Sequence, residues 1–256
     1  MTIPVKAILL DLDGVLYVGQ EPLPGAIKAF ECLRETSLPM AGVTNTTTQS
    51  KSHVVDKLHT LGFDFASDGI FTPAALAVQC IGGKSASFFI RDQLREDFQS
   101  VAEDDDHPDF VVMGDIGSAG YDPVKLQRIF ELVIDGAELL ALHKNRFWQK
   151  PEGLVLDLGT YVAAIEYATG KSAKVLGKPS PSFFHLICAQ LNVRPEEALM
   201  VGDDIESDIG GAIDAGLKAA LVKTGKYRED FAKQTGIKPN LTLPSIADLP
   251  DALNLL

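Results

Sequence analysis

The chain contains few cysteines, and their spacing suits no disulfide framework. Cys32, Cys80 and Cys188 are the only cysteines among the 256 residues, and no CxxC pair occurs. An odd number of widely separated cysteines argues against structural disulfides and for a reducing compartment. Each lies among apolar residues, so packing is favoured over catalysis for all three.

Positive charge is also scarce. Lys and Arg together number 23 against 35 Asp and Glu, which gives a net charge of −12. This balance argues against the basic face of a protein that binds nucleic acid or an anionic membrane. If the substrate is a phosphate, local charges or a bound cation must attract it, because the overall field does not.

Long hydrophobic runs are absent as well. No apolar stretch approaches the roughly 20 residues that span a bilayer. The apolar run near the N-terminus, in MTIPVKAILLDLDG, is short and breaks at Asp11 and Asp13, unlike a signal peptide. We expect a cytoplasmic protein that has neither a membrane nor nucleic acid as a partner.

What remains is the composition of a globular α/β protein. The chain is 46% apolar, and its length suits one large domain or two modest ones. Apolar runs at 5–10 and 40–43 predict short buried strands. Helical spacing follows each run, with Ile27, Phe30 and Leu33 on the first apolar stripe. This alternation of strands and helices predicts a parallel sheet.

The C-terminal third repeats the alternation. Strands are predicted at 174–176, 198–201 and 217–222. A helix with Ser180 as its N-cap precedes the second of these strands, and a helix that ends at Gly216 precedes the third.

The middle of the chain, 82–174, has an α/β pattern of its own and is predicted to be inserted into the first unit. After the acidic run 103–106, the pattern predicts a strand, a helix, a strand, a long loop and a second helix. These elements are expected at 110–113, 123–134, 138–142, 144–158 and 161–168.

Chemically active residues follow four of the predicted strands. They are Asp11 with Asp13, Thr44 with Asn45, Lys178, and Asp203 with Asp204. Ligands of open parallel α/β sheets bind beyond the carboxyl ends of the strands, so the fold is expected to gather these residues at one rim.

The residue types at this rim suit phosphoryl transfer. Asp11 can attack phosphorus and form an acyl phosphate, and Asp13 can protonate the leaving oxygen and later deprotonate water. Mg²⁺ would relieve the repulsion between the crowded carboxylates, with Asp11 and Asp203 as its side-chain ligands. Lys178 would neutralise a phosphate oxygen and orient Asp11.

Thr44 and Asn45 would donate hydrogen bonds to the phosphate. Each motif alone has a simpler interpretation: a turn for DxD, a helix cap for Thr44 and Asn45, a solvated lysine for Lys178, and a helix start for GDDxxxD. The four together, in this order and each at a strand end, favour a phosphoryl-transfer site.

The strings DLDGVLYVG, TNTTTQS, GKPSP and GDDIESDIGGA resemble the four motifs of the haloacid-dehalogenase-like superfamily, and the resemblance covers essentially the whole chain. The spacing of the motifs resembles that of members with a class II cap, and DGIFTPAALA and HKNRFWQKPEGLVLDLG look like subclass IIA. The pattern from Gly153 onwards is especially similar to the phospholysine phosphohistidine inorganic pyrophosphate phosphatases and their relatives.

The resemblance implies a Rossmann-like three-layer core with a parallel sheet and an inserted α/β cap. The core would consist of 1–81 with 175–256, and the cap would be 82–174. Members of subclass IIA often dimerise, so a homodimer formed through the cap is expected.

The resemblance also assigns roles. Asp11 would be the nucleophile and a metal ligand, and Asp13 the acid and base, with its backbone carbonyl on the metal. Asp203 would be the third ligand. Asp208 would orient metal-bound water or Lys178, and Asp204 would lie beside the metal. The dehalogenases of the superfamily lack an acid at the position of Asp13, so its presence favours phosphoryl transfer.

Several functions remain open at this point. The chain would be a phosphatase of small phosphorylated molecules, a phosphatase of phosphohistidine, phospholysine or pyrophosphate, or a non-catalytic or phospho-accepting binding protein on the same fold. Receiver domains share the acceptor Asp, the acidic pair and the Lys, but they are about half this length and carry no cap. The loop 144–158 is expected to choose the substrate, with Asn145 and Arg146 as polar contacts and Phe147 or Trp148 as apolar ones.

Overall fold

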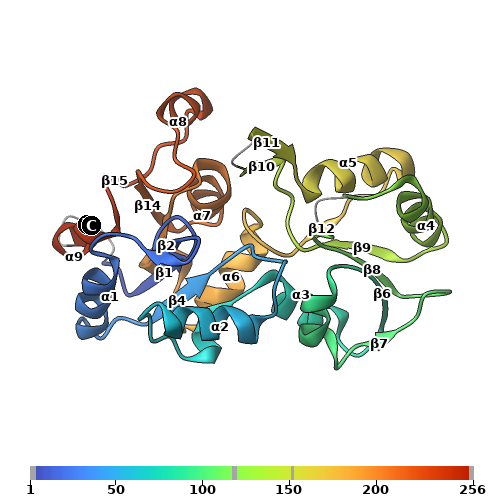
Figure 1. Ribbon diagram of the computed structural model, residues 1–256, viewed down its shortest axis with the longest axis horizontal. Coiled ribbons are helices and arrows are strands. Elements are labelled where there is room, and N and C mark those ends of the chain that lie inside the picture. Colours follow the sequence, from blue (N-terminus) through green and yellow to red (C-terminus); the bar gives the residue numbers. More distant parts are fainter. Residues whose placement is uncertain (1–3, 117–119, 151–152, 254–256) are drawn as a thin grey trace. The chain divides into compact units, whose positions relative to one another are not determined.

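The computed structural model describes residues 4–116, 120–150 and 153–253, with side chains apart from those of 148–154. By its internal contacts the chain divides into two compact units. Unit 1 comprises Met1–Thr44, Val55–Phe71 and Lys178–Leu256, and unit 2 comprises Asn45–Val54 and Thr72–Gly177. Unit 1 thus joins the two ends of the sequence, blue and orange to red in Figure 1. The expected inserted domain, 82–174, lies within unit 2, and its limits after 81 and after 174 remain a prediction.

Within the described part of the chain, unit 1 contains a sheet of six parallel strands in the order β15-β14-β13-β1-β4-β5. Its strands are β1 (Ala7–Asp11), β4 (Met40–Val43), β5 (Ile70–Phe71), β13 (Ala198–Gly202), β14 (Lys218–Val222) and β15 (Leu241–Leu243). The two central strands, AILLD and ALMVG, are buried at every residue. A strand buried on both faces reads as a continuous apolar run, which is why these two could be found in the sequence.

The strand order of unit 1 reverses at its centre. From β1 the chain moves outward to β4 and β5, whereas from β13 it moves in the other direction to β14 and β15. β1 pairs with β13 in register, with Leu10 opposite Val201. The carboxyl ends of β1 and β13 therefore flank the topological switch point, where ligands of this sheet type bind.

Helices cover both faces of this sheet, because right-handed crossovers in opposite directions fall on opposite faces. The helices of unit 1 are α1 (Ala26–Glu35), α6 (Pro181–Gln190), α7 (Gly211–Asp214), α8 (Glu229–Thr235) and α9 (Leu249–Ala252), and α2 (Lys51–Thr60) begins in unit 2 and ends in unit 1. α1 contacts α9, and α6 contacts α7. Unit 1 also contains the hairpin of β2 (Tyr17–Val18) and β3 (Glu21–Pro22).

Two details of these helices differ from the sequence-based expectation. Phe30 and Leu33 are buried as expected, but Ile27 is 37% exposed. Ala26 and Ala29 complete the buried stripe, and this i, i+3, i+4, i+7 spacing leaves Ile27 on the flank. Ser180 does precede α6, but its hydroxyl bonds the Ser182 hydroxyl and caps no helix amide.

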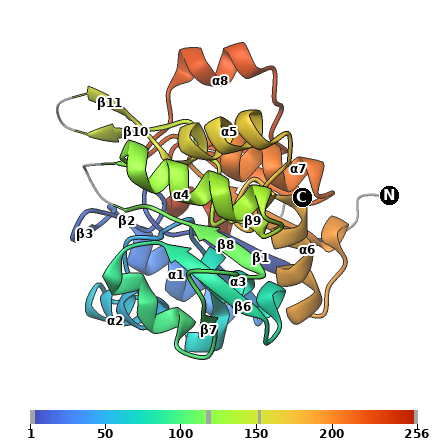
Figure 2. The ribbon, with the colours of Figure 1, turned by 90° about the vertical axis from the view of Figure 1, so that its right-hand side faces the viewer.

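Unit 2 contains its own parallel sheet, in the order β12-β9-β8-β6-β7 among the described residues. The strands are β6 (Ser85–Phe89), β7 (Ala102–Glu103), β8 (Phe110–Met113), β9 (Glu138–Ala141) and β12 (Lys174–Val175). Side chains alternate across it: Val112 and Leu140 join one buried cluster, and Val111 and Leu139 join another. The sheet is thus covered on both faces, by α3 (Pro73–Ile81) on one and by α4 (Pro123–Ile134) and α5 (Leu158–Thr169) on the other (Figure 2).

Helix α3 has sequence signals that the strand-and-helix pattern did not use. Thr72 precedes it, and its hydroxyl accepts a hydrogen bond from the amide of Ala75. Pro73 occupies the first helical position, where its fixed φ suits the helix. The helix ends at Gly82, whose φ of 59° is left-handed.

The expected long loop at 144–158 is wrong in part. Two strands, β10 (Phe147–Lys150) and β11 (Gly153–Leu156), form an antiparallel pair, with Phe147 opposite Leu156. Aromatic and β-branched residues such as Phe147 and Val155 favour extended backbone, and each strand has only four residues. Such short runs between stronger signals are easily taken for a loop.

Among the described residues, no helix combines the length and the apolar character needed to cross a bilayer. The expected cytoplasmic location stays a prediction.

Helix α4 offers a matched test of which face stabilises unit 2. Val133 is fully buried and Val124 is 80% exposed. Val133→Ala should lower the free energy of unfolding of unit 2 by about 2 kcal/mol, through lost burial and the cavity left behind. Val124→Ala should change it by less than about 0.5 kcal/mol. Urea unfolding followed by circular dichroism measures both, and equal losses would show that this packing is assigned to the wrong face.

Candidate active site

A buried lysine joins two aspartates at the switch point of unit 1. Asp11 is the last residue of β1, and Asp208 lies in the single π-helical turn Ile205–Gly210 that follows β13. Lys178 Nζ lies 2.7 Å from Asp11 Oδ1 and 2.6 Å from Asp208 Oδ1. All three side chains are buried. Burial alone would lower the pKa of Lys178, but the charges of Asp11 and Asp208 outweigh it and raise the pKa above its ordinary value.

Asp203 is held by backbone on one side and lacks a partner on the other. Its Oδ2 accepts a hydrogen bond of 2.6 Å from the amide of Lys226. Its Oδ1 is buried and has no hydrogen-bond partner among the described residues. A buried acceptor without a partner is costly, so this oxygen calls for a cation or a donor that the described residues do not supply.

Two glycines allow the backbone to approach Asp203. A Cβ on Gly14 or on Gly225 would lie 2.0 Å from Asp203 Oδ2, and the two residues have φ values of +92° and +54°. Only glycine combines this left-handed backbone with the absence of a side chain at low cost.

Three carboxylates meet at this point. Asp11, Asp203 and Asp208 each offer an oxygen, and these oxygens all lie within 4.8 Å of one another. Burial, followed by the charges of Asp11 and Asp208, raises the pKa of Asp203 to about 8. Burial and the charge of Asp11 likewise raise the pKa of Asp208 to about 7. An all-oxygen donor set with an unpartnered buried oxygen fits a hard divalent cation such as Mg²⁺.

Asp204 and Asp208 have different surroundings. The carboxylate of Asp204 accepts hydrogen bonds from the amides of Glu206 and Ser207 and so caps its own turn. The amide of Asp204 in turn donates to Asp208 Oδ2 at 3.1 Å. Asp208 therefore positions Lys178 and the turn together, while Asp204 is engaged with the turn itself.

Asp13 lies just beyond β1, in a tight turn closed by the hydrogen bond from the Gly14 amide to the Tyr17 carbonyl at 2.7 Å. Asp13 as a whole residue is exposed, whereas Asp11 is buried, but the carboxyl group of Asp13 is partly shielded from water. Loss of hydration, followed by the charge of Asp11, raises the pKa of Asp13, and the charges of Lys226 and Lys57 oppose this. A raised pKa suits a carboxyl group that must donate a proton.

The structure adds three residues that the sequence analysis missed. Lys57 Nζ lies 4.0 Å from the centre of the Tyr17 ring, and burial followed by the charge of Asp13 raises the pKa of Tyr17. Lys226 follows β14 and contacts Asp203 through its amide. Inspection of the residues after every strand could have found Lys226, whereas no local signal distinguishes Tyr17 or Lys57.

Thr44 follows β4, is buried, and donates its amide to the Phe71 carbonyl at 3.1 Å. Asn45 is the first residue of unit 2. Thr44 therefore lies in the same unit as the aspartate cluster, as expected from its strand end. The phosphate-binding roles of Thr44 and Asn45 stay a prediction.

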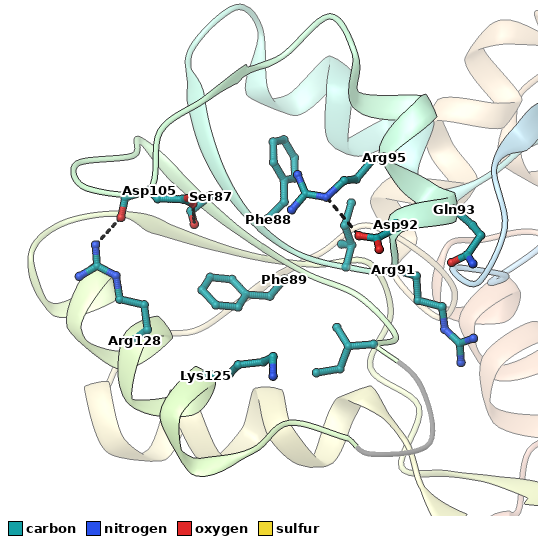
Figure 3. A pocket seen from close by; sticks show the side chains of 12 residues that line it. Ser87, Phe88, Phe89, Arg91, Asp92, Gln93, Arg95, Asp105, Lys125 and Arg128 are labelled. Atoms are coloured by element: carbon teal, nitrogen blue, oxygen red, sulfur yellow. Dashed lines mark hydrogen bonds and ion pairs between the residues drawn. The ribbon is translucent and has the colours of Figure 1, made fainter.

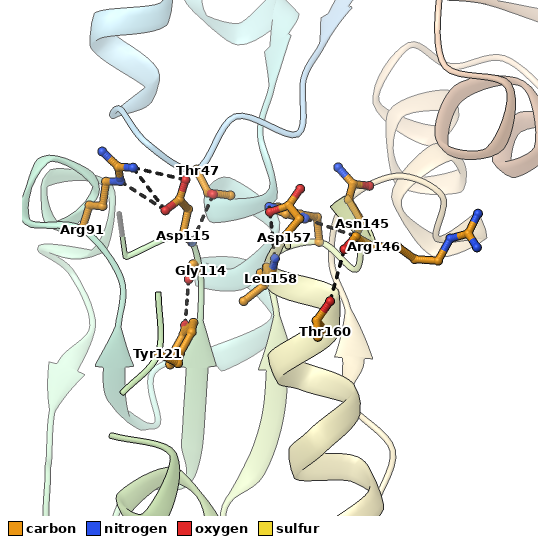
Figure 4. Close-up of polar contacts among 11 residues, drawn as sticks. Thr47, Arg91, Gly114, Asp115, Tyr121, Asn145, Arg146, Asp157, Leu158 and Thr160 are labelled. Atoms are coloured by element: carbon orange, nitrogen blue, oxygen red, sulfur yellow. Dashed lines mark hydrogen bonds and ion pairs between the residues drawn. The ribbon is translucent and has the colours of Figure 1, made fainter. Parts of the chain in front are cut away.

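Asn145 and Arg146 lie in unit 2, before β10. The Asn145 carbonyl accepts a hydrogen bond from the Gly159 amide at 3.0 Å. The Arg146 carbonyl accepts one from the Thr160 hydroxyl at 3.1 Å (Figure 4). These bonds tie both residues to the start of α5. The Arg146 guanidinium lies 5.7 Å from the Phe147 ring centre. The side chain of Trp148 lies outside the described residues.

In the sheet of unit 2, an ion pair joins the segments that follow β6 and β8. Arg91 Nη2 lies 3.2 Å from Asp115 Oδ1, and the Asp115 amide donates to the Thr47 hydroxyl at 3.3 Å (Figure 4). The sequence analysis did not single out these residues, because they are far apart in the sequence and only the folded chain brings them into contact.

Comparison with known proteins decides the family. The family model of haloacid dehalogenase-like hydrolases matches 8–102, and a second model of HAD-like hydrolases matches 175–249. Haloacid dehalogenase-like hydrolase domain-containing protein 2 of Pongo abelii is 39% identical over 249 residues, which cover 96% of this chain and 95% of the relative. The chain belongs to the haloacid dehalogenase-like hydrolases.

Two further relatives are phosphatases by name. Phospholysine phosphohistidine inorganic pyrophosphate phosphatase of Xenopus laevis is 34% identical and is covered to 94%, with 97% of this chain aligned. The crystal structure of a 4-nitrophenylphosphatase of Thermotoga maritima matches with a TM-score of 0.89, at 27% identity over 97% of both chains. The predicted family, the α/β fold class and the assignment as a phosphatase-type hydrolase of this family are thereby confirmed.

The raised pKa of Asp203 gives a pH dependence to the metal-free protein. A folded-state pKa of about 8 against about 4 in the unfolded chain means that the folded state binds more protons between these pH values. Stability should therefore fall as pH rises from 6 to 8, by at most about 1.4 kcal/mol per pH unit for one such group. Urea unfolding in the presence of chelator measures this slope.

The matched variant is Asp203→Asn, which removes this titration. Its unfolding free energy should depend less on pH than that of the wild type between pH 6 and 8. Added Mg²⁺ should raise the stability of the wild type most at the high end of this range. Parallel pH profiles for both proteins would show that Asp203 ionises at its ordinary pKa.

Proposed function

We propose that the chain is a Mg²⁺-dependent phosphatase that hydrolyses phosphate esters, phosphoramidates or pyrophosphate of a small substrate through an aspartyl-phosphate on Asp11. The observation that carries this proposal is the buried Lys178 between Asp11 and Asp208, close to the Oδ1 atom of Asp203, which has no partner in the described part of the chain. The names of the phosphatase relatives support it.

In the first step, a carboxylate oxygen of Asp11 attacks the phosphorus atom, and the bond from phosphorus to the leaving group breaks. Lys178 neutralises charge on the phosphoryl oxygens and fixes the carboxylate of Asp11, which it already contacts at 2.7 Å. Asp13, whose pKa is raised, gives its proton to the leaving oxygen or nitrogen atom.

In the second step, Asp13 takes a proton from water, and the resulting nucleophile attacks the phosphorus of the aspartyl-phosphate. The bond to Asp11 breaks, phosphate leaves, and Asp11 returns as a carboxylate. Asp13 thus ends each turnover in the protonated form in which it began. Thr44 and Asn45 would donate hydrogen bonds to the phosphoryl oxygens.

The residues that would hold Mg²⁺ are Asp11, Asp203 and the backbone carbonyl of Asp13. When bound, the ion neutralises the negative charge that gathers around the transferred phosphoryl group. Asp208 would keep Lys178 in place, and Asp204 would stabilise the turn that carries Asp208.

Unit 2 would choose the substrate, since the residues of the cluster contact only the phosphoryl group that all candidate substrates share. Asn145 and Arg146 remain the candidates for polar contacts. A homodimer through the inserted α/β region and a cytoplasmic location complete the proposal.

Metal dependence is the first test. Hydrolysis of an aryl phosphate should vanish with chelator and return with Mg²⁺, because the all-oxygen donor set suits this ion. Phosphate release measures the rate, and circular dichroism with chelator confirms that the fold persists. Full turnover in metal-free buffer would overturn the assignment of the cation.

The second test separates the two aspartates. Asp11→Asn should abolish turnover of every substrate, because no acyl phosphate can form. Asp13→Asn should slow hydrolysis by roughly 10²–10⁴-fold, with partial recovery on aryl phosphates whose leaving groups have a low pKa. Rates across a series of substituted aryl phosphates, with acid-quench detection of phosphorylated protein, measure both effects.

Equal residual rates of the two variants across that series would contradict the assigned roles. Wild-type protein that becomes phosphorylated on Asp11 without releasing phosphate would instead favour the alternative, a phospho-accepting binding protein.

A further inference from the structure

A pocket of about 670 Å³ lies within unit 2, at the edge of β6. It is bounded by the 3₁₀ helix Asp92–Phe98 on one side and by α4 on the other (Figure 3). Its volume falls within the range of roughly 300–1,000 Å³ that is typical of small-molecule sites. None of its lining residues belongs to the aspartate cluster, so the proposed phosphatase chemistry does not explain it.

The edge of β6 is covered over only part of its length. β7 pairs with Ser85 and Ala86 alone, and the Ala86 carbonyl accepts from Asp104. Peptide groups of a strand alternate in direction, so the amide and carbonyl of Phe88 point to the same side as those of Ala86, beyond the end of β7. In the described part of the chain, no strand pairs with β6 there. The pocket therefore offers a ligand main-chain donors and acceptors.

Among the residues that line the pocket, cations outnumber carboxylates, which is the reverse of the balance in the whole chain. Four cations line it, namely Arg91, Arg95, Lys125 and Arg128, against the two carboxylates of Asp92 and Asp105. The whole chain has 23 basic residues against 35 acidic ones. Cations gathered around one pocket of an acidic protein indicate an anionic ligand.

Three of these cations are held only by solvent-exposed partners or by main chain. Arg95 pairs with Asp92 and Glu103, and Lys125 pairs with Asp122. Arg128 bonds the Asp105 carbonyl and also pairs with the exposed carboxylates of Asp106 and Glu131. Exposed ion pairs are worth only about 0–1 kcal/mol. A ligand carboxylate, sulfonate or phosphate can therefore replace them at little cost.

Partly exposed apolar side chains supply the rest of the lining. Phe88 and Phe89 are both half-buried and project from opposite faces of β6, and Ile116 is half-buried as well. Figure 3 shows the Phe89 ring between Lys125 and Ser87, and the Phe88 ring beside Arg95. Rings next to cations suit a flat apolar body that carries a negative group.

We propose that this pocket binds a small organic anion with a flat apolar body, as a ligand site separate from the aspartate cluster. The anionic group lies between Lys125 and Arg128, and the apolar body contacts Phe88 and Phe89.

The test uses 8-anilinonaphthalene-1-sulfonate as the anionic probe and N-phenyl-1-naphthylamine, which lacks the sulfonate, as its neutral counterpart. Fluorescence titration of the full chain should show saturable binding of the anionic probe. Lys125→Gln combined with Arg128→Gln should weaken it by roughly tenfold or more, because two charge-assisted contacts are lost. The neutral probe should bind both proteins equally weakly.

The control variant is Lys233→Gln on α8, since Lys233 also forms an exposed ion pair within a helix, with Glu229. It should leave the affinity for the anionic probe unchanged. Amide resonances of 87–90 should shift with the anionic probe in the wild type and not in the double variant.

Hydrolysis of an aryl phosphate by the double variant should match the wild type, which shows that the protein is folded. Unchanged affinity in the double variant, an equal loss in Lys233→Gln, or equal binding of the two probes to the wild type would each overturn the proposal.

Discussion

The buried contact of Lys178 with Asp11 and Asp208 is the interaction on which the site of unit 1 depends. Lys178 Nζ lies 2.7 Å from Asp11 Oδ1 and 2.6 Å from Asp208 Oδ1, and none of the three side chains has appreciable access to water. Removing one partner of a buried ion pair costs about 3–5 kcal/mol, because the remaining charge stays buried without compensation. Lys178 thus holds the two carboxylates together, and in the proposed mechanism it also positions Asp11 for attack.

The fold brings this contact about through three separate parts of the sequence. Asp11 ends one central strand, Asp208 lies in the turn after the other, and Lys178 enters as the chain returns to unit 1. The parallel pairing of β1 with β13 fixes the distance between the first two. Gly14 and Gly225 then let two further backbone segments close around Asp203. The site therefore depends on strand register more than on any single loop.

This dependence explains how much could be predicted from the sequence. Fully apolar strands that end in acids are visible without a structure, and they placed Asp11 and Asp203 at one rim, where their carboxylates do lie close together. The strand predicted at 174–176 is β12, which pairs with β9 in the sheet of unit 2, so the strand-end argument for Lys178 was wrong. Lys178 nevertheless contacts Asp11. The strand and the helix of 110–134 were found at their true bounds, because the strand is a continuous apolar run and the helix has a strong periodicity. Ile27 was placed on the wrong face, since an apolar side chain beside a buried stripe is indistinguishable from a member of it.

Residues that act through tertiary contacts could not be predicted in this way. Tyr17 and Lys57 meet across the fold, and nothing near either of them in the sequence indicates the other. Arg91 and Asp115 follow different strands and carry no motif. Two-residue strands such as β5 and β7 are too short for an alternation to be visible. The strands of the hairpin of β10 and β11 have four residues each, but half of FWQK is polar, so the segment lacks the apolar run of β4 or β8.

The sign of the local charge separates the two sites of the molecule. With every group ionised, the three carboxylates of the cluster exceed the single charge of Lys178, so the cluster stays negative and repels a phosphate. Burial first, and then this repulsion, raises the pKa values of Asp203 and Asp208. In the proposed function, a divalent ion would therefore also allow the phosphate to approach, in addition to its part in the reaction.

The pocket at β6 has the reverse balance, with more cations than carboxylates in its lining. An anion can enter it without any metal ion, and the exposed ion pairs around it yield at little cost. Chelator should therefore weaken anion binding at the aspartate cluster and leave it unchanged at the pocket, since only the cluster would need a bound cation to supply positive charge. In a chain of net charge −12, anions are attracted by local groups of cations or by a bound ion, and the two proposed sites would each rely on a different one of these.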